Sequence, residues 1–157
     1  MKENEKFKLL SEILDYTAFN QAIIFSNTVQ KTIALSQKLT EILFNPITIH
    51  SDLTQETRIK TYETFKNNGS RLLVATDLFG RGIDIKNVNL VINYDCPRRP
   101  EEYLHRVGRA SRFGTSGVVI TFLDENRLME ERNMLDQYGH LMNSDIDRMP
   151  ANLRPYM

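Results

Sequence analysis

Three arginines stand at intervals of three residues in the stretch YLHRVGRASRFGT, which spans residues 103–115. They are Arg106, Arg109 and Arg112, and His105 directly precedes the first of them. A guanidinium group is planar, keeps its charge at physiological pH and can bind two phosphate oxygens at once. A run of charges at this spacing also fits a solvated helix face. The cluster therefore indicates either an anion-binding site or an exposed charged surface.

The composition makes a local arginine cluster informative. The 157 residues contain 20 Lys and Arg against 20 Asp and Glu, so the formal net charge is zero at pH 7. Anion binding must then come from local patches and not from the field of the whole chain. The single cysteine, Cys96, rules out an intrachain disulfide and fits a reducing compartment. No apolar run reaches transmembrane length, so we expect an intracellular domain with no membrane contact.

Short apolar runs and helical periods alternate along the chain, and these elements must position the cluster. Strands are expected at 21–25, 45–50, 71–76, 89–95 and 117–123, and helices at 4–17, 29–43, 54–66 and around 100–107. Strands that are apolar on both faces and alternate with helices are typical of a parallel sheet covered on both sides. We therefore predict one α/β domain over residues 1–157, with a mostly parallel central sheet, helices on both faces and a loosely attached tail from about residue 142.

Polar side chains follow the ends of the predicted strands. The first four strands are followed by Ser26-Asn27-Thr28, His50-Ser51-Asp52, Thr76-Asp77 and Asp95. Carboxyl ends of parallel strands meet at one edge of a sheet, where ligands bind, and helix N-termini favour phosphate groups. The sequence predicts a phosphate-binding edge, with the simpler alternative that Thr28 serves only as a helix cap.

Two other kinds of site are less well supported. His50 and His105 have no metal-ligand spacing to Cys96, so no metal site is expected. The stretch FLDEN, which contains Asp124 and Glu125, resembles the acidic strand end of a nucleotide hydrolase, but the sequence has no G-x-x-x-x-G-K-[ST] phosphate loop. We therefore interpret Asp124 and Glu125 as the start of a helix, where acidic side chains suit the helix dipole.

Five segments occur together in one order and spacing: IIFSNT, IHSDLTQETR, LLVATDLFGRGIDI, VINYDCP and YLHRVGRASRFGT. They are similar to the second RecA-like domain of DEAD-box RNA helicases over nearly the whole chain, and most resemble the spliceosomal and mRNA-export subfamily. The resemblance implies a RecA-like three-layer sandwich and an ATP-driven clamp in which two domains close around ATP and a bent RNA strand. Two departures are Ser111 and Ser51, which stand where glycine is usual in the family.

The resemblance also implies roles for individual residues. Arg109 and Arg112 match arginine fingers that reach the γ-phosphate of ATP held on the partner domain. The ribose hydroxyls of the nucleotide are expected at Asp84, beside Gly82. Residues expected to link the two domains are Arg81, His105 and Arg106. Those expected to hold the RNA backbone are Thr28, Gln55, Arg58, Thr76 and Asp77, so RNA binding should not depend on base sequence.

The implied cofactor is ATP, with Mg²⁺ held by an N-terminal RecA-like domain that is absent from this chain. The implied partners are RNA, that N-terminal domain, and splicing or mRNA-export factors. The implied location of the protein is the nucleus, with or without shuttling to the cytoplasm. Alternatives are a helicase of translation initiation or RNA decay, or a stand-alone RNA- or partner-binding module without turnover. An oxidoreductase or receiver-like domain is disfavoured, because G-x-G-x-x-G does not follow the first predicted strand.

Overall fold

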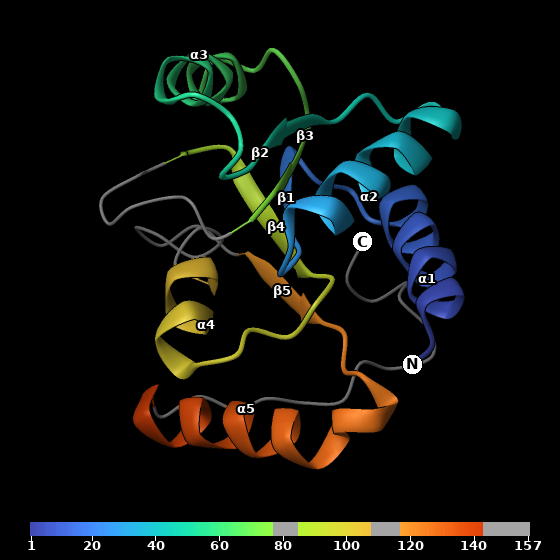
Figure 1. The fold of residues 1–157 in the computed structure, drawn as a ribbon, viewed down its shortest axis with the longest axis vertical. Helices are drawn as coiled ribbons and strands as arrows, with labels where there is room; N and C mark the ends of the chain where they lie inside the picture. Colours follow the sequence, from blue (N-terminus) through green and yellow to red (C-terminus); the bar gives the residue numbers. More distant parts are fainter. Residues whose placement is uncertain (77–84, 108–116, 143–157) are drawn as a thin grey trace.

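The computed structural model describes residues 1–76, 85–107 and 117–142. Helices and strands alternate along this part of the chain, except that β4 directly follows β3 among the described elements (Figure 1). In order they are α1 (Glu3–Tyr16), β1 (Gln21–Phe25), α2 (Val29–Glu41), β2 (Ile47–Ile49), α3 (Gln55–Lys66), β3 (Leu72–Ala75), β4 (Val88–Asn93), α4 (Pro100–Val107), β5 (Val118–Thr121), the 3-10 helix η1 (Glu125–Arg127) and α5 (Leu128–Met142).

The five strands form one sheet in the order β2-β3-β1-β4-β5, and every described strand pair is parallel. Strand β1 lies at the centre, with Ile24 opposite Val74 of β3 and Ile92 of β4. This arrangement confirms the predicted α/β fold with a parallel sheet. Because all strands point the same way, their carboxyl ends gather at one edge of the sheet.

Alternate residues of β1 pack on opposite faces of the sheet, as the two-residue period of a strand requires. Ala22 and Ile24 belong to the core that α1 and α2 cover, whereas Ile23 and Phe25 belong to the core beneath α3. In Figure 1, α1 and α2 lie together on one side of the sheet and α3 and α4 on the other. The sheet is thus buried on both faces, which explains why its strands read as unbroken apolar runs.

Helices α4 and α5 pack on one another, and α5 lies beyond the β5 edge of the sheet (Figure 1). The rings of Tyr103 and Tyr138 meet edge to face with centroids 4.3 Å apart. Asp124 caps η1, its carboxylate accepting a hydrogen bond from the Asn126 backbone N–H at 2.9 Å. The predicted helix start at Asp124 and Glu125 is therefore confirmed. The sequence analysis did not predict helix α5, which extends to Met142.

Several predicted elements are shorter than expected, and two of them show why. The helix predicted over 29–43 ends at Glu41, and Leu43 takes a left-handed φ of 71° that the α-helix cannot continue. The strand predicted over 45–50 is limited to Ile47–Ile49, at the edge of the sheet, where only β3 is available to pair with it. Within the described ranges, no helix combines the length and apolar character that crossing a membrane requires.

Candidate functional site

The carboxyl edge of the sheet carries the predicted phosphate-binding residues at the starts of two helices. Thr28 is the N-cap of α2 and is exposed, and its Oγ1 accepts a hydrogen bond from the Lys31 backbone N–H at 3.2 Å. Thr54 caps α3 in the same way from the Thr57 N–H, also at 3.2 Å, and Gln55 opens that helix with an exposed side chain. The remaining N–H groups of each first turn point toward this edge, where an anion suits the helix dipole.

Two polar atoms at the β2–β3 part of this edge are buried without a partner. Among the described residues, neither Nε of Arg58 nor Oγ1 of Thr76 has a hydrogen-bond partner. Arg58 lies in the first turns of α3, and the backbone N–H of Thr76 donates to the Ile49 carbonyl at 3.2 Å. Buried polar groups are nearly always hydrogen-bonded in native proteins. These two atoms are therefore candidates for groups that a ligand satisfies.

A buried carboxylate organises the β1–β4 part of the edge. The Oδ1 of Asp95 accepts from Lys31 Nζ at 2.8 Å and from Lys6 Nζ at 3.5 Å, and its Oδ2 accepts from the Asn27 backbone N–H at 2.9 Å. Burial opposes ionisation of Asp95, but the hydrogen bonds from Lys31 and Asn27 and the charges of both lysines outweigh it and lower its pKa. The same pairing raises the pKa of Lys31 against the opposing effect of its own burial. Asp95 and Lys31 are thus both charged at neutral pH.

Arg106 lies at the centre of this cluster and is fully buried, with 0% of the residue exposed. Its Nη1 donates to the Asp95 carbonyl at 2.8 Å and to Asn93 Oδ1 at 3.3 Å, and its Nη2 donates to Asn27 Oδ1 at 2.8 Å. Its guanidinium carbon also stands 5.2 Å from the centroid of the Phe25 ring. The alternative of a solvated helix face is therefore wrong for Arg106. The hydrogen bonds described here hold Arg106 within this domain. Its expected role in linking the two domains stays a prediction.

The other predicted residues are placed in part or not at all. His50 is 8% exposed, and its Nδ1 accepts from the Asp52 backbone N–H at 3.3 Å, which suits a structural histidine. The side chain of His105 lies outside the described part of the structure, although its backbone belongs to α4. Residues wholly outside the described ranges are Asp77, Arg81, Gly82, Asp84, Arg109 and Arg112. Their assigned roles stay predictions.

Sequence reasoning gave no role to Lys6, Lys31 and Asn93, which complete the buried cluster. Lys6 was detectable in principle, because it lies four residues before Leu10 and seven before Ile13, on the apolar face of α1. A lysine on such a face requires a buried partner. No local pattern names that partner, since Asp95 lies 89 residues further along the chain.

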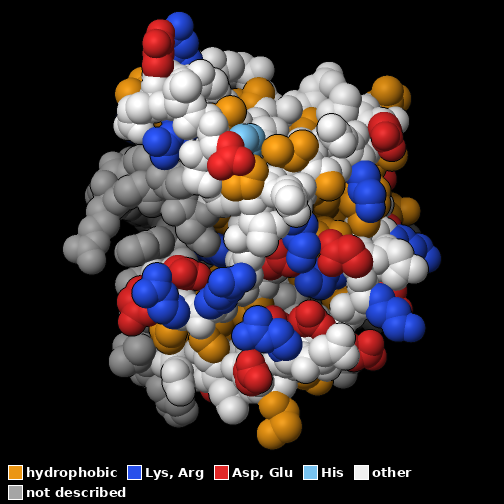
Figure 2. Space-filling view, in the orientation of Figure 1, with side chains coloured by type: hydrophobic (Ala, Val, Ile, Leu, Met, Phe, Trp, Pro, Cys, Tyr) orange, Lys and Arg blue, Asp and Glu red, His pale blue; other side chains and the backbone are white. Residues whose placement is uncertain are grey.

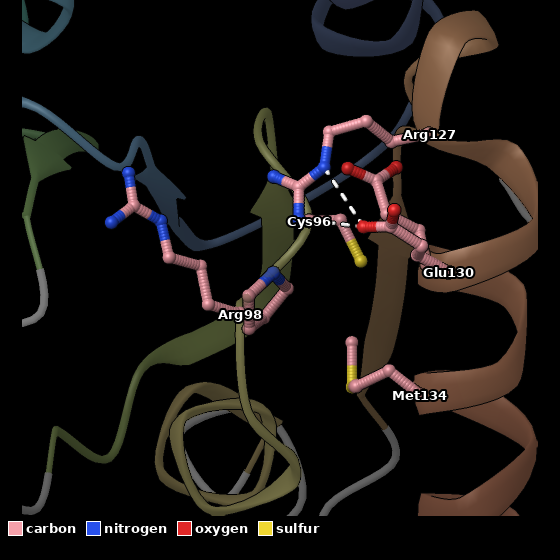
Figure 3. Close-up of a pocket in the computed structure, with 7 residues that line it drawn as sticks. Cys96, Arg98, Arg127, Glu130 and Met134 are labelled. Atoms are coloured by element: carbon pink, nitrogen blue, oxygen red, sulfur yellow. Dashed lines mark hydrogen bonds and ion pairs between the residues drawn. The ribbon is translucent and has the colours of Figure 1, made fainter.

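A cavity of about 110 Å³ opens beside this cluster, between the β4–α4 connection and α5 (Figure 3). Its lining consists of Cys96, Pro97, Arg98, Arg127, Glu130, Glu131 and Met134. Burial raises the pKa of the Cys96 thiol to about 12, so the thiol is protonated at neutral pH and is a poor nucleophile or metal ligand. Of the predicted site residues that the structure describes, none lines this cavity.

Neither the face drawn in Figure 2 nor the acidic residues of the described ranges indicate another site. On the face in Figure 2, basic and acidic side chains alternate and form no single basic patch. In the described parts of the chain, no group of three or more His, Cys, Asp or Glu residues is arranged to hold a metal ion. The unpartnered polar atoms and capped helix starts at the carboxyl edge therefore remain the best candidate site.

Comparisons with known proteins identify the family of this chain. The helicase conserved C-terminal domain family matches residues 5–114. The ATP-dependent RNA helicase WM6 of Drosophila melanogaster is 49% identical over 154 residues, which cover 98% of this chain and 35% of that protein. The ATP-dependent RNA helicase uap56 of Schizosaccharomyces pombe is 45% identical over 153 residues, with coverages of 98% and 35%. The chain thus spans about a third of the length of these relatives.

A solved structure shows the same fold. Dbp5 of S. cerevisiae, bound to RNA and ADP BeF3, superposes with a TM-score of 0.81 at 32% identity, over 92% of this chain and 38% of that one. Its likeness covers the five-stranded parallel sheet together with its flanking helices. This chain belongs to the helicase conserved C-terminal domain family and is a C-terminal RecA-like domain of the DEAD-box type.

Proposed function

We propose that this domain works as the C-terminal half of an ATP-dependent DEAD-box RNA helicase. In this role it supplies half of an RNA-backbone site and the arginine fingers for ATP hydrolysis. WM6 and uap56 are named ATP-dependent RNA helicases, and the chain matches about a third of each. The remaining two thirds of those relatives leave room for the N-terminal RecA-like domain that the proposal requires.

The observation that carries the proposal is the pair of buried, unpartnered atoms Arg58 Nε and Thr76 Oγ1. Leaving such a group without a partner costs about 1–3 kcal/mol, so a ligand that supplies acceptors or donors there gains affinity. A ribose-phosphate chain offers both kinds of group, and it presents them independently of base sequence. Thr28 and Gln55, exposed at the starts of α2 and α3, extend this site along the same edge. Asp77 is proposed to continue it beyond Thr76.

ATP, when bound between the two domains, supplies the free energy that drives closing and reopening. On this domain, Arg109 and Arg112 are proposed to stabilise the charge that develops on the γ-phosphate. Asp84 is proposed to hold the ribose hydroxyls, with Gly82 allowing close approach. Mg²⁺ is assigned to the other domain. Arg81, His105 and Arg106 are proposed to order the interface between the domains.

We further propose a role in pre-mRNA splicing and mRNA export, because the five sequence segments most resemble that subfamily, and hence a nuclear location with splicing or export factors as partners. A role in translation initiation or RNA decay is the alternative within the same family. Cells depleted of the full-length protein distinguish these roles. We expect intron-containing or nuclear poly(A) RNA to accumulate, with translation and RNA half-lives unchanged at first.

The activity itself is tested by comparing the isolated chain with a two-domain protein that contains its N-terminal partner. We expect no ATPase above background from the chain alone, with or without RNA, and RNA-stimulated turnover from the two-domain protein. Turnover by highly purified chain alone would contradict the half-site. An inactive two-domain protein that still binds RNA would favour the stand-alone binding module.

A further inference from the structure

Asn27 joins three segments of the carboxyl edge. It lies between the end of β1 and Thr28, the N-cap of α2. Its backbone N–H donates to Asp95 Oδ2 at 2.9 Å, its Oδ1 accepts from Arg106 Nη2 at 2.8 Å, and its Nδ2 donates to the Cys96 carbonyl at 3.0 Å. One half-buried residue thereby connects the β1–α2 turn to the segment after β4 and to α4.

The partners of Asn27 are themselves held firmly. Arg106 is fully buried and has two further acceptors, Asn93 Oδ1 and the Asp95 carbonyl. The Asp95 carboxylate is fixed by the ammonium groups of Lys31 and Lys6. A buried guanidinium that loses an acceptor finds no water to replace it, so the surrounding segments must move. The position of Asn27 is therefore tied to the position of α4.

Each end of this linkage leads to one of the two proposed sites. Thr28, which directly follows Asn27, belongs to the proposed RNA edge. Helix α4 ends at Val107, only two residues before the proposed finger Arg109. We propose that Asn27 is a positioning residue that keeps the RNA-facing start of α2 and the helix leading to the arginine fingers in one fixed arrangement. This inference rests on the proposed helicase function.

A positioning role predicts that one substitution changes two kinetic parameters together. Asn27→Ala in the two-domain protein should lower kcat at saturating RNA on the order of tenfold, because misplacing a catalytic group by a fraction of an ångström is costly. It should also raise the KM for RNA by roughly fivefold, the loss expected for about one hydrogen bond to phosphate. Thr28→Ala, at a proposed RNA contact, should raise the KM for RNA more strongly than it lowers kcat.

Two further asparagine variants separate positioning from general stability. Asn27→Asp retains an oxygen acceptor for Arg106 but loses the donor to the Cys96 carbonyl, so it should recover part of the lost kcat. Asn87→Ala is the matched control, because its Nδ2 donates to Asn68 Oδ1 at 3.0 Å at the opposite, amino end of the sheet. It should leave both kinetic parameters unchanged. RNA-stimulated ATPase and Tm are measured for all variants at a temperature well below the lowest Tm.

The outcomes are separable. The inference is overturned if Asn27→Ala changes Tm alone, if kcat and KM for RNA both stay within about twofold of wild type, or if Asn27→Asp recovers nothing. Wild-type protein without RNA-stimulated ATPase would instead overturn the proposed function, and the inference with it. If Asn27→Ala does not fold, Lys31→Met replaces it, because Lys31 is half-exposed and reaches Asp95 at 2.8 Å. Lys31→Met must then lower kcat and Lys31→Arg restore it, and failure of either also overturns the inference.

Discussion

The two halves of the carboxyl edge treat polar side chains in opposite ways. Where β1 and β4 end, Asp95 and Arg106 each have at least three hydrogen-bonding or charged partners at 2.8 to 3.5 Å. Where β2 and β3 end, Arg58 Nε and Thr76 Oγ1 are buried with no partner among the described residues. Both halves are built from the same kinds of residue at the same edge of one sheet.

The difference separates a structural role from a ligand-binding one. In the β1–β4 half, Asp95 and Arg106 are bound by partners within the domain. They therefore hold backbone segments in place and have few hydrogen-bonding groups left for a ligand. In the β2–β3 half, unpartnered groups destabilise the unliganded domain, and a bound ligand removes that penalty. Charge content alone therefore does not identify the binding part of the edge.

The largest effect is expected at Arg109, which tests whether the arginine cluster as a whole resembles the paired half. In the two-domain protein, Arg109→Lys should lower kcat by about a thousandfold, because a lysine does not reproduce the planar fork of an arginine finger. Tm should not change. Arg99→Lys is the control, since Arg99 is exposed and pairs with Glu102 at 3.2 Å. A loss of rate at Arg109 that follows a loss of stability would assign a structural role to it.

The next effect concerns Arg106 and is one of stability. Arg106→Met should lower the free energy of unfolding by roughly 3 kcal/mol, because three acceptors in a buried site lose their donor. Urea unfolding of wild type and variant measures this. Arg71→Met is the matched control, because Arg71 is exposed and hydrogen-bonds to carbonyls near the amino end of the sheet. Equal losses for the two variants would remove the distinction between the halves.

A smaller effect is expected at Arg58 and is one of binding. Arg58→Ala should weaken single-stranded RNA binding by the two-domain protein roughly fivefold for every base sequence and lower its salt dependence by about one phosphate contact. Stability should stay the same or rise, because an unpartnered buried group is removed. Fluorescence anisotropy at several salt concentrations measures this, with Lys60→Ala as the control on the same helix. A strong dependence on base sequence would contradict a backbone site.

The smallest effect is expected from acid titration of Asp95. Its pKa in the folded protein lies below the ordinary value of 3.8, because of its hydrogen bonds and lysine partners. The stability that this carboxylate contributes is therefore complete above about pH 4 and is lost as pH falls through the lowered pKa. The difference in unfolding free energy between wild type and Asp95→Asn should shrink between pH 5 and strongly acidic pH. A constant difference over that range would show that Asp95 is not part of a charged pair.

Helices and strands were predicted well where the spacing of apolar residues along one segment is enough to define them. The apolar run QAIIF became β1, and Thr28 was expected as a cap because its side chain and the helix that follows are adjacent in sequence. Boundaries were less accurate where a single backbone conformation or the number of neighbouring strands sets them, as at Leu43 and β2. The partners of Arg106 were not predicted, because Asn27 lies 79 residues away in the sequence.

The sequence by itself determined the parallel α/β fold, the carboxyl edge as the candidate site and the family, because apolar period and linear motifs are local properties of the chain. Only the tertiary structure decided which charged residues at that edge are paired and which are left for a ligand. Lys6 is paired with Asp95, 89 residues further along the chain, and Arg106 is paired with Asn27, 79 residues before it, so each is stable in the interior only because a distant segment brings a partner to it. Burial and pairing are properties of the packed domain, and no one segment contains them.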